Sequence, residues 1–125
     1  MNDRSKTKQE DMHFRVLRLL QDNPNLTQRE LADAVGISLG TVNYCLRALL
    51  GKGQIKIRNF RNSDRKLTYA YLLTPSGLAR KAELTARFLS RKLDEYEQLK
   101  TEIQMLRQET EKGREAPEPD MSAPG

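Results

Sequence analysis

The sequence predicts a mainly α-helical fold with one small β-hairpin, followed by a long C-terminal helix. Three observations support this prediction. Residues 27–47 show the spacing of two short helices that meet at a tight turn. Two runs of β-favouring residues flank a short polar segment. Residues 78–112 contain no proline or glycine that would interrupt a helix.

The composition favours a small folded domain with a polyanionic partner. The chain has 125 residues and a net charge of +5, and seven basic side chains lie between Arg47 and Lys66 against one acid, Asp64. The mean hydropathy is −0.76, and we find no membrane-spanning run and no signal-peptide pattern. We therefore expect a cytoplasmic protein. The single cysteine, Cys45, cannot form an internal disulfide.

The first predicted helix spans Gln9 to Asp22 and opens a domain that we place at residues 9–73. Residues 1–8 are polar, and we expect them to form a disordered N-terminal arm. Asn23-Pro24-Asn25 ends the helix, because proline disfavours helical geometry at the residue before it. Its apolar positions repeat at helical intervals and predict a core-facing stripe of Met12, Val16, Leu19 and Leu20.

The pair of short helices begins with a capping box. Thr27 is an N-cap, and Glu30 stands three residues later. Ala32 is small enough for a steep helix crossing, and Gly36 suits a sharp turn with positive φ. Ser38 then caps a second helix over residues 38–50. The apolar positions of this helix predict a buried face of Val42, Cys45, Leu46 and Leu49.

The opposite face of the helix at 38–50 suits contact with DNA. Small residues at its start allow a close approach, and polar side chains can bond base edges or phosphates. Thr27 and Gln28, at the start of the preceding helix, suit a phosphate. The alternative is an ordinary helical hairpin with a polar solvent face. The candidate contacts on the second helix are Ser38, Leu39, Gly40, Thr41, Asn43, Tyr44 and Arg47.

A β-hairpin with a basic tip follows. The first strand covers residues 54–60, where Ile55, Ile57 and Phe60 suggest alternation with a slip near the end. The second covers residues 67–73, and residues 61–66 form the polar turn. Such a hairpin is stable only when packed on the helices. Its basic residues are placed to reach a DNA backbone or minor groove: Arg58, Arg61, Arg65 and Lys66.

In this order of elements the chain resembles the winged helix-turn-helix transcriptional regulators of the MarR type, most of all the short members associated with exopolysaccharide (EPS) gene clusters. The resemblance covers residues 12–93 and rests on the pieces TQRELADAVGIS, LLGKGQI and YLLTPSG. It implies a homodimer that binds a palindromic operator in double-stranded DNA. The recognition helix would be residues 38–50, the wing tip residues 61–66, and we expect a repressor.

One departure from the MarR pattern concerns the N-terminus. Many members have an additional N-terminal helix that helps form the dimer interface and the effector pocket, whereas here only a short polar arm precedes the first helix. We identify no small-molecule effector. Dimerisation is therefore expected to depend on the C-terminal helix.

The predicted dimerisation helix spans residues 74–112. Thr74 is an N-cap, and Pro75 occupies the first helical position. Lys100 interrupts the heptad seam at an a position, and Leu99 and Leu106 fall at g positions. The alternative is a helix that folds back on its own domain. Residues 113–125 form an acidic, proline-rich tail that we expect to be disordered. The remaining a and d residues are Ala79, Ala82, Ala86, Leu89, Leu93, Tyr96 and Ile103.

Other functions are less well supported by the residues present. The sequence has no nucleophile–base set, no phosphate-binding glycine loop and no metal constellation around its only histidine, His13, so we expect neither an enzyme nor a cofactor. Redox sensing is not favoured either, because Cys45 occupies a core position and lacks a second cysteine. The alternative function is a winged-helix protein-interaction or scaffold module without specific DNA binding.

Overall fold

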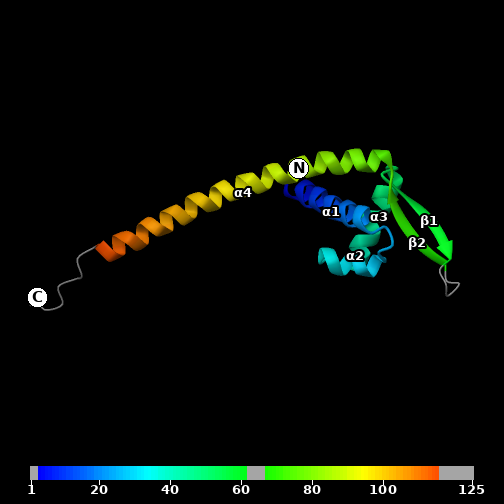
Figure 1. The fold of residues 1–125 in the computed structure, drawn as a ribbon, viewed down its shortest axis with the longest axis horizontal. Helices are drawn as coiled ribbons and strands as arrows, with labels where there is room; N and C mark the ends of the chain where they lie inside the picture. Colours follow the sequence, from blue (N-terminus) through cyan, green and yellow to red (C-terminus); the bar gives the residue numbers. More distant parts are fainter. Residues whose placement is uncertain (1–2, 62–66, 116–125) are drawn as a thin grey trace, which may run out of the picture. The chain divides into compact units, whose positions relative to one another are not determined.

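The computed structural model describes residues 3–61 and 67–115. In chain order the elements are α1 (Asp3–Asp22), α2 (Gln28–Val35), α3 (Leu39–Gly51), β1 (Ile55–Arg61), β2 (Leu67–Leu73) and α4 (Pro75–Glu115) (Figure 1). The chain divides into two compact units, Met1–Phe88 and Leu89–Gly125. The first unit therefore holds the three short helices, the hairpin and the beginning of α4. The described part of the second unit is the remainder of α4.

The first unit is built around one hydrophobic core. Its three central helices and β1 each contribute side chains, and the beginning of α4 adds Leu84. Complete burial of a valine, leucine or isoleucine side chain stabilises a fold by about 1.5–3 kcal/mol. The side chains with almost no exposed surface are Val16, Leu17, Leu20, Leu31, Val42, Cys45, Leu46, Leu49, Ile55 and Leu84.

Helix α1 begins earlier than the sequence predicted. Residues 3–8, which we expected to be disordered, form its first turns. These residues are all polar or charged and carry no apolar stripe, so the periodicity gave no signal there. Further along α1, the buried carboxylate of Glu10 forms an ion pair with Arg87 of α4. Arg87 Nη1 donates a hydrogen bond to Glu10 Oε1 at 2.6 Å. This contact holds α1 against the beginning of α4.

The helix-turn-helix forms as predicted. Thr27 accepts a hydrogen bond from the Glu30 amide, and the Glu30 carboxylate accepts one from the Thr27 amide, which completes the capping box. Gly36 has φ 77°, and Ser38 caps α3 by accepting from the Thr41 amide. Helices α2 and α3 are bent by 108° at the turn. That angle lies within the range of helix-turn-helix motifs.

Strands β1 and β2 form a two-stranded antiparallel sheet. The pairing runs without interruption from Ile55 opposite Leu73 to Arg61 opposite Leu67. The slip expected near Phe60 is therefore wrong, because the backbone ladder continues one residue further. The amide of Tyr71 in β2 donates to the carbonyl of Pro24, in the loop between α1 and α2. This bond and the burial of Ile55 attach the hairpin to the helices.

Helix α4 starts at a tight junction. Thr74 caps it by accepting from the Gly77 amide, as predicted. Gly77 lies so close to β1 that a Cβ atom there would stand 1.9 Å from the carbonyl oxygen of Gln54. The helix ends at Glu115, three residues beyond the predicted end, and includes Gly113 from the expected tail.

The beginning of α4 packs on its own domain. Leu84 is fully buried, and the ring of Phe88 stacks on Phe14 with 4.9 Å between centroids. The alternative of a helix that folds back is therefore correct for residues 75–88. The predicted seam residues of this part, Ala79, Ala82 and Ala86, are exposed on the single chain. They take no part in the core of the domain.

Candidate nucleic-acid interface

Helix α3 presents one buried face and one exposed face. Val42, Cys45, Leu46 and Leu49 are buried, as the spacing predicted. On the other face, Tyr44 is 70% exposed and Leu39 is 46% exposed, and Arg47 is exposed as well. The buried side chains fix the orientation of α3 on the domain. The exposed residues on its other face therefore point away from the core. The helix contains no acidic residue.

The start of α3 is exposed and carries small side chains. Ser38 and Gly40 are exposed, and a Cβ atom at Gly40 would meet nothing within 4 Å. The hydroxyls of Ser38 and Thr41 lie 2.7 Å apart, so they bond each other beside the cap. A helix N-terminus with amides near the surface and no acid in its first turn attracts anions. A polyanion can therefore approach this end closely.

Two predicted contact residues are instead engaged inside the domain. Gln28 and Asn43 are half-buried, and Asn43 Nδ2 donates to Gln28 Oε1 at 3.3 Å. Gln28 Nε2 in turn donates to the hydroxyl of Tyr71 in β2 at 3.1 Å. This chain of bonds ties α3, α2 and the hairpin together. The side chain of Gln28 is thus occupied, and Asn43 retains only part of its bonding capacity for a ligand.

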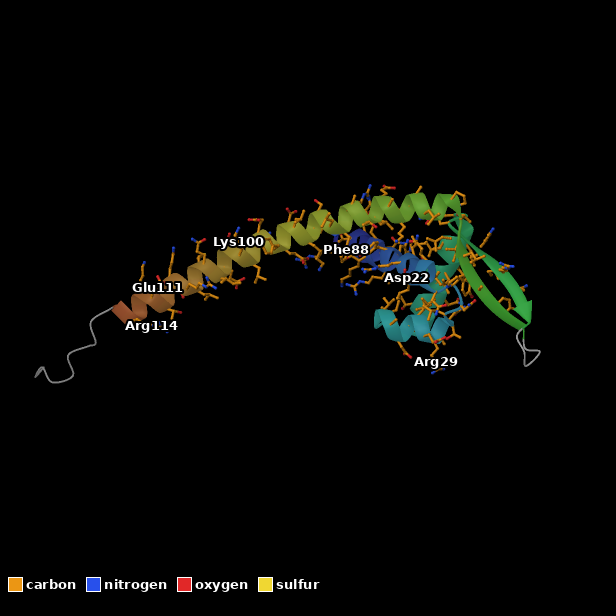
Figure 2. All side chains as sticks on the ribbon, viewed as in Figure 1. Asp22, Arg29, Phe88, Lys100, Glu111 and Arg114 are labelled. Carbon is orange, nitrogen blue, oxygen red and sulfur yellow. The ribbon has the colours of Figure 1, made fainter. Side chains whose placement is uncertain are left out.

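Basic residues are also exposed on α2 and β1, the elements that precede and follow α3 in the chain. Arg29, which the sequence analysis did not select, is exposed in the first turn of α2 and points outward (Figure 2). The feature of the sequence that could have identified Arg29 is its position beside Gln28, at the start of a predicted helix. Thr27 is exposed in the same turn. On β1, Lys56 and Arg58 are exposed and share one face of the strand by alternation. The side chains of Arg61, Arg65 and Lys66 lie outside the described residues.

Metal-binding and thiol chemistry have no support in the described residues. No group of three or more histidine, cysteine or acidic side chains that could hold a metal occurs among them. Burial raises the pKa of the Cys45 thiol to about 12, so the reactive thiolate is suppressed. Within the described residues, no single helix has the length and apolar composition to cross a bilayer; α2 and α3 reach it only as a bent pair.

Comparisons with known proteins agree on the fold. Residues 9–56 match a family model described as winged helix-turn-helix DNA-binding. The domain is a winged helix-turn-helix. No curated protein matches the sequence. The similar solved structures include a MarR/EmrR family transcriptional regulator from Acinetobacter sp. ADP1, which is 20% identical with a TM-score of 0.53, covering 80% of this chain and 75% of that one.

Two further solved structures extend the comparison. The PcaV transcriptional regulator from Streptomyces coelicolor is 21% identical with a TM-score of 0.55, covering 80% of this chain and 78% of that one. A point mutant of MepR from S. aureus, bound to an oligodeoxyribonucleotide, is 22% identical with a TM-score of 0.53, covering 86% of this chain and 88% of that one. At these identities the likeness shows the fold alone.

Proposed function

We propose that this protein is a sequence-specific, double-stranded DNA-binding transcriptional regulator that acts as a homodimer in the cytoplasm. The observation that carries the proposal is the exposed face of α3. It is acid-free, Ser38, Gly40 and Thr41 at its start are small, and Tyr44 and Arg47 extend from it. Such a face fits the major groove of a DNA duplex, whose width admits a helix.

The residues divide into groups with different roles. Arg47 is the leading base contact, because arginine bonds guanine through two donors. Tyr44 and the small residues of the first turn lie against base edges or the adjacent phosphates. Arg29, Thr27 and Arg58 contact the phosphate backbone, and the basic wing reaches the backbone or the minor groove. Asn43 acts mainly by bracing α3, given its bond to Gln28.

The operator follows from two-fold symmetry. In a homodimer, two copies of α3 enter successive major grooves, so the half-sites lie about 10 base pairs apart and form a palindrome. A short dimer that covers a promoter acts as a repressor. The similarity to MepR supports this proposal, because that protein is bound to an oligodeoxyribonucleotide. Exopolysaccharide genes are the proposed targets on the basis of the sequence resemblance.

The dimer is proposed to form through α4. Its exposed apolar residues include Leu89, Leu93, Tyr96 and Ile103, all of them in the second unit and without contacts that bury them in the single chain. Ala79, Ala82 and Ala86 continue the seam into the first unit. A helix of 41 residues with such a stripe is typical of a coiled coil.

The test begins with selection from a library of random DNA duplexes. We expect enrichment of a palindrome. In Arg47→Ala, the Kd measured at fixed salt should rise about 5- to 150-fold, which corresponds to a loss of about 1–3 kcal/mol of binding free energy. The matched control is Arg18→Ala, which removes an exposed arginine from α1. No enriched sequence, or equal affinity of wild type and Arg47→Ala, would refute the proposal.

A second function is favoured by one observation. Leu39, Tyr44, Ile57 and Tyr69 are large apolar or aromatic side chains that remain exposed on the domain, and such residues also occur in protein interfaces. The alternative is therefore a protein-interaction module. A salt titration distinguishes the two functions, because phosphate contacts give an affinity that falls steeply with salt concentration.

A further inference from the structure

The second unit carries an apolar stripe whose spacing is that of a coiled coil. Tyr96, Leu99, Ile103 and Leu106 are 58%, 54%, 42% and 54% exposed, at successive steps of three, four and three residues. Thr110 continues the pattern four residues later. Its hydroxyl donates to the carbonyl of Leu106 at 2.9 Å, so the Thr110 side chain can enter an apolar seam with its hydroxyl already bonded.

The surface of α4 is hollowed along this stripe. One open hollow is lined by residues from Tyr96 to Arg107, and a second is lined by residues from Ile103 to Arg114. In a coiled coil, each side chain at an a or d position inserts between four residues of the facing helix. The hollows lie where such insertions from a second helix are expected. The stripe therefore fits a helix of the same kind.

This stripe has a different heptad phase from the seam predicted upstream. Tyr96, Ile103 and Thr110 take a positions, and Leu99 and Leu106 take d positions. Lys100, which interrupted the predicted seam at an a position, moves to a flanking e position. Its ammonium lies 5.9 Å from the centre of the Tyr96 ring. Tyr96 belongs to both phases, so the seam shifts there by a three-residue step, which overwinds a coil locally.

The new phase arranges the charges in a regular way. Between residues 95 and 114, every e position from Lys100 onward is basic and every g position is acidic. The e positions are Lys100, Arg107 and Arg114, and the g positions are Glu95, Glu102 and Glu109. All six are exposed. Glu95 pairs with Lys92 at 3.0 Å, whereas the other five make no ion pair within the described part of the chain.

We propose that residues 95–114 of two copies form a parallel, in-register coiled coil. In that arrangement each g residue faces the e residue five positions later on the other helix. Glu95 then faces the partner's Lys100, Glu102 faces the partner's Arg107, and Glu109 faces the partner's Arg114. Two-fold symmetry repeats each pair, so all six contacts are attractive.

An antiparallel coil is disfavoured by the same charges. It sets e positions against e positions and g positions against g positions. Basic residues would then face basic residues, and acidic residues would face acidic ones. The parallel form also connects both helix-turn-helix domains to the same end of the coil, as a palindromic operator needs. This inference rests on the homodimer proposed above and adds its orientation and register.

Cysteine cross-linking tests the orientation in the full-length chain. Leu99→Cys and Leu106→Cys, made separately, place thiols at two d positions seven residues apart, about 10 Å along the helix. A parallel, in-register pair brings each cysteine against its own copy, so both variants form disulfide-linked dimers on mild oxidation. An antiparallel pair aligns at most one of them. The matched controls are Thr101→Cys, at an outward f position, and the wild type, whose Cys45 is buried.

The outcomes separate the inference from the dimer. Cross-linking of both d-position variants and of neither control supports the parallel coil. A dimer by light scattering in which only one or neither variant cross-links overturns the orientation and leaves the dimer. A monomer by light scattering overturns both. DNA binding is measured independently of these results.

Charge exchange provides a second test of the register. The triple variant Lys100→Glu, Arg107→Glu, Arg114→Glu makes every e–g contact repulsive, and so does Glu95→Lys, Glu102→Lys, Glu109→Lys. We expect the dimer Kd of each variant alone to rise about tenfold or more. An equimolar mixture should dimerise as tightly as the wild type. An unchanged Kd for either variant alone would overturn the assignment of these charges to the coil.

Discussion

Replacement of Gly77 by alanine tests the junction that places α4 on the domain. The added methyl would lie 1.9 Å from the carbonyl oxygen of Gln54 and 2.9 Å from its carbonyl carbon. Ordinary contact begins near 3.4 Å, so the backbone of one partner must move by about 1.5 Å. Overpacking of this kind costs about 1–3 kcal/mol. The movement also threatens the 3.1 Å bond from the Thr74 amide to the same carbonyl, worth about 1 kcal/mol.

We therefore expect Gly77→Ala to lower the free energy of unfolding by about 3 kcal/mol. In a domain of this size that corresponds to a fall in Tm of about 12–24 °C. Urea denaturation and thermal melts at one protein concentration measure the effect, because the proposed dimer would make Tm depend on concentration. The matched control is Gly51→Ala, which meets nothing within 4 Å and lies in α3. It should stabilise the chain slightly, through helix propensity. Equal stability of Gly77→Ala and wild type would refute the close contact.

Two predictions concern buried titratable groups. The pKa of His13 is lowered from its ordinary value, first by burial and then by Lys52 and Arg80, with Glu10 opposing. Because folding disfavours protonation of His13, its contribution to stability is present above pH 6.5 and declines as the pH falls below that value, by at most about 1.4 kcal/mol per pH unit. Urea denaturation between pH 5.5 and 7.5 should show this slope in the wild type and lose it in His13→Leu. The Cys45 thiol, with its pKa raised to about 12, should resist iodoacetamide at pH 8 in the folded protein and react fully in denaturant; equal rates would contradict its burial.

The sequence predicted best what depends on neighbouring residues. The capping box of Thr27 and Glu30, the positive φ of Gly36 and the cap at Ser38 each involve partners within a few positions. Such interactions are encoded by residue type and spacing alone. The buried face of α3 followed equally well from a helical period, because one apolar stripe has only one side to bury.

Contacts between distant segments were not predictable in the same way. The Glu10–Arg87 pair joins residues 77 positions apart, and no local pattern announces it. The bonds from Asn43 to Gln28 and from Gln28 to Tyr71 engage two candidate DNA contacts within the domain. Amide side chains look the same in a sequence whether they face a ligand or a neighbouring helix. Only their half-buried position in the fold distinguishes these roles.

In α4, a single heptad pattern could not predict which residues pack on the domain. The beginning of the helix has two apolar faces, since Leu84 is buried in the core while Ala82 and Ala86 are exposed. At 3.6 residues per turn, each alanine lies roughly 160° around the helix from Leu84. Packing on the domain therefore leaves the side with these two alanines exposed. Because the two faces do not overlap, we expect a change at an alanine position to affect the proposed dimer without opening the core, whereas a change at Leu84 acts first on the domain itself.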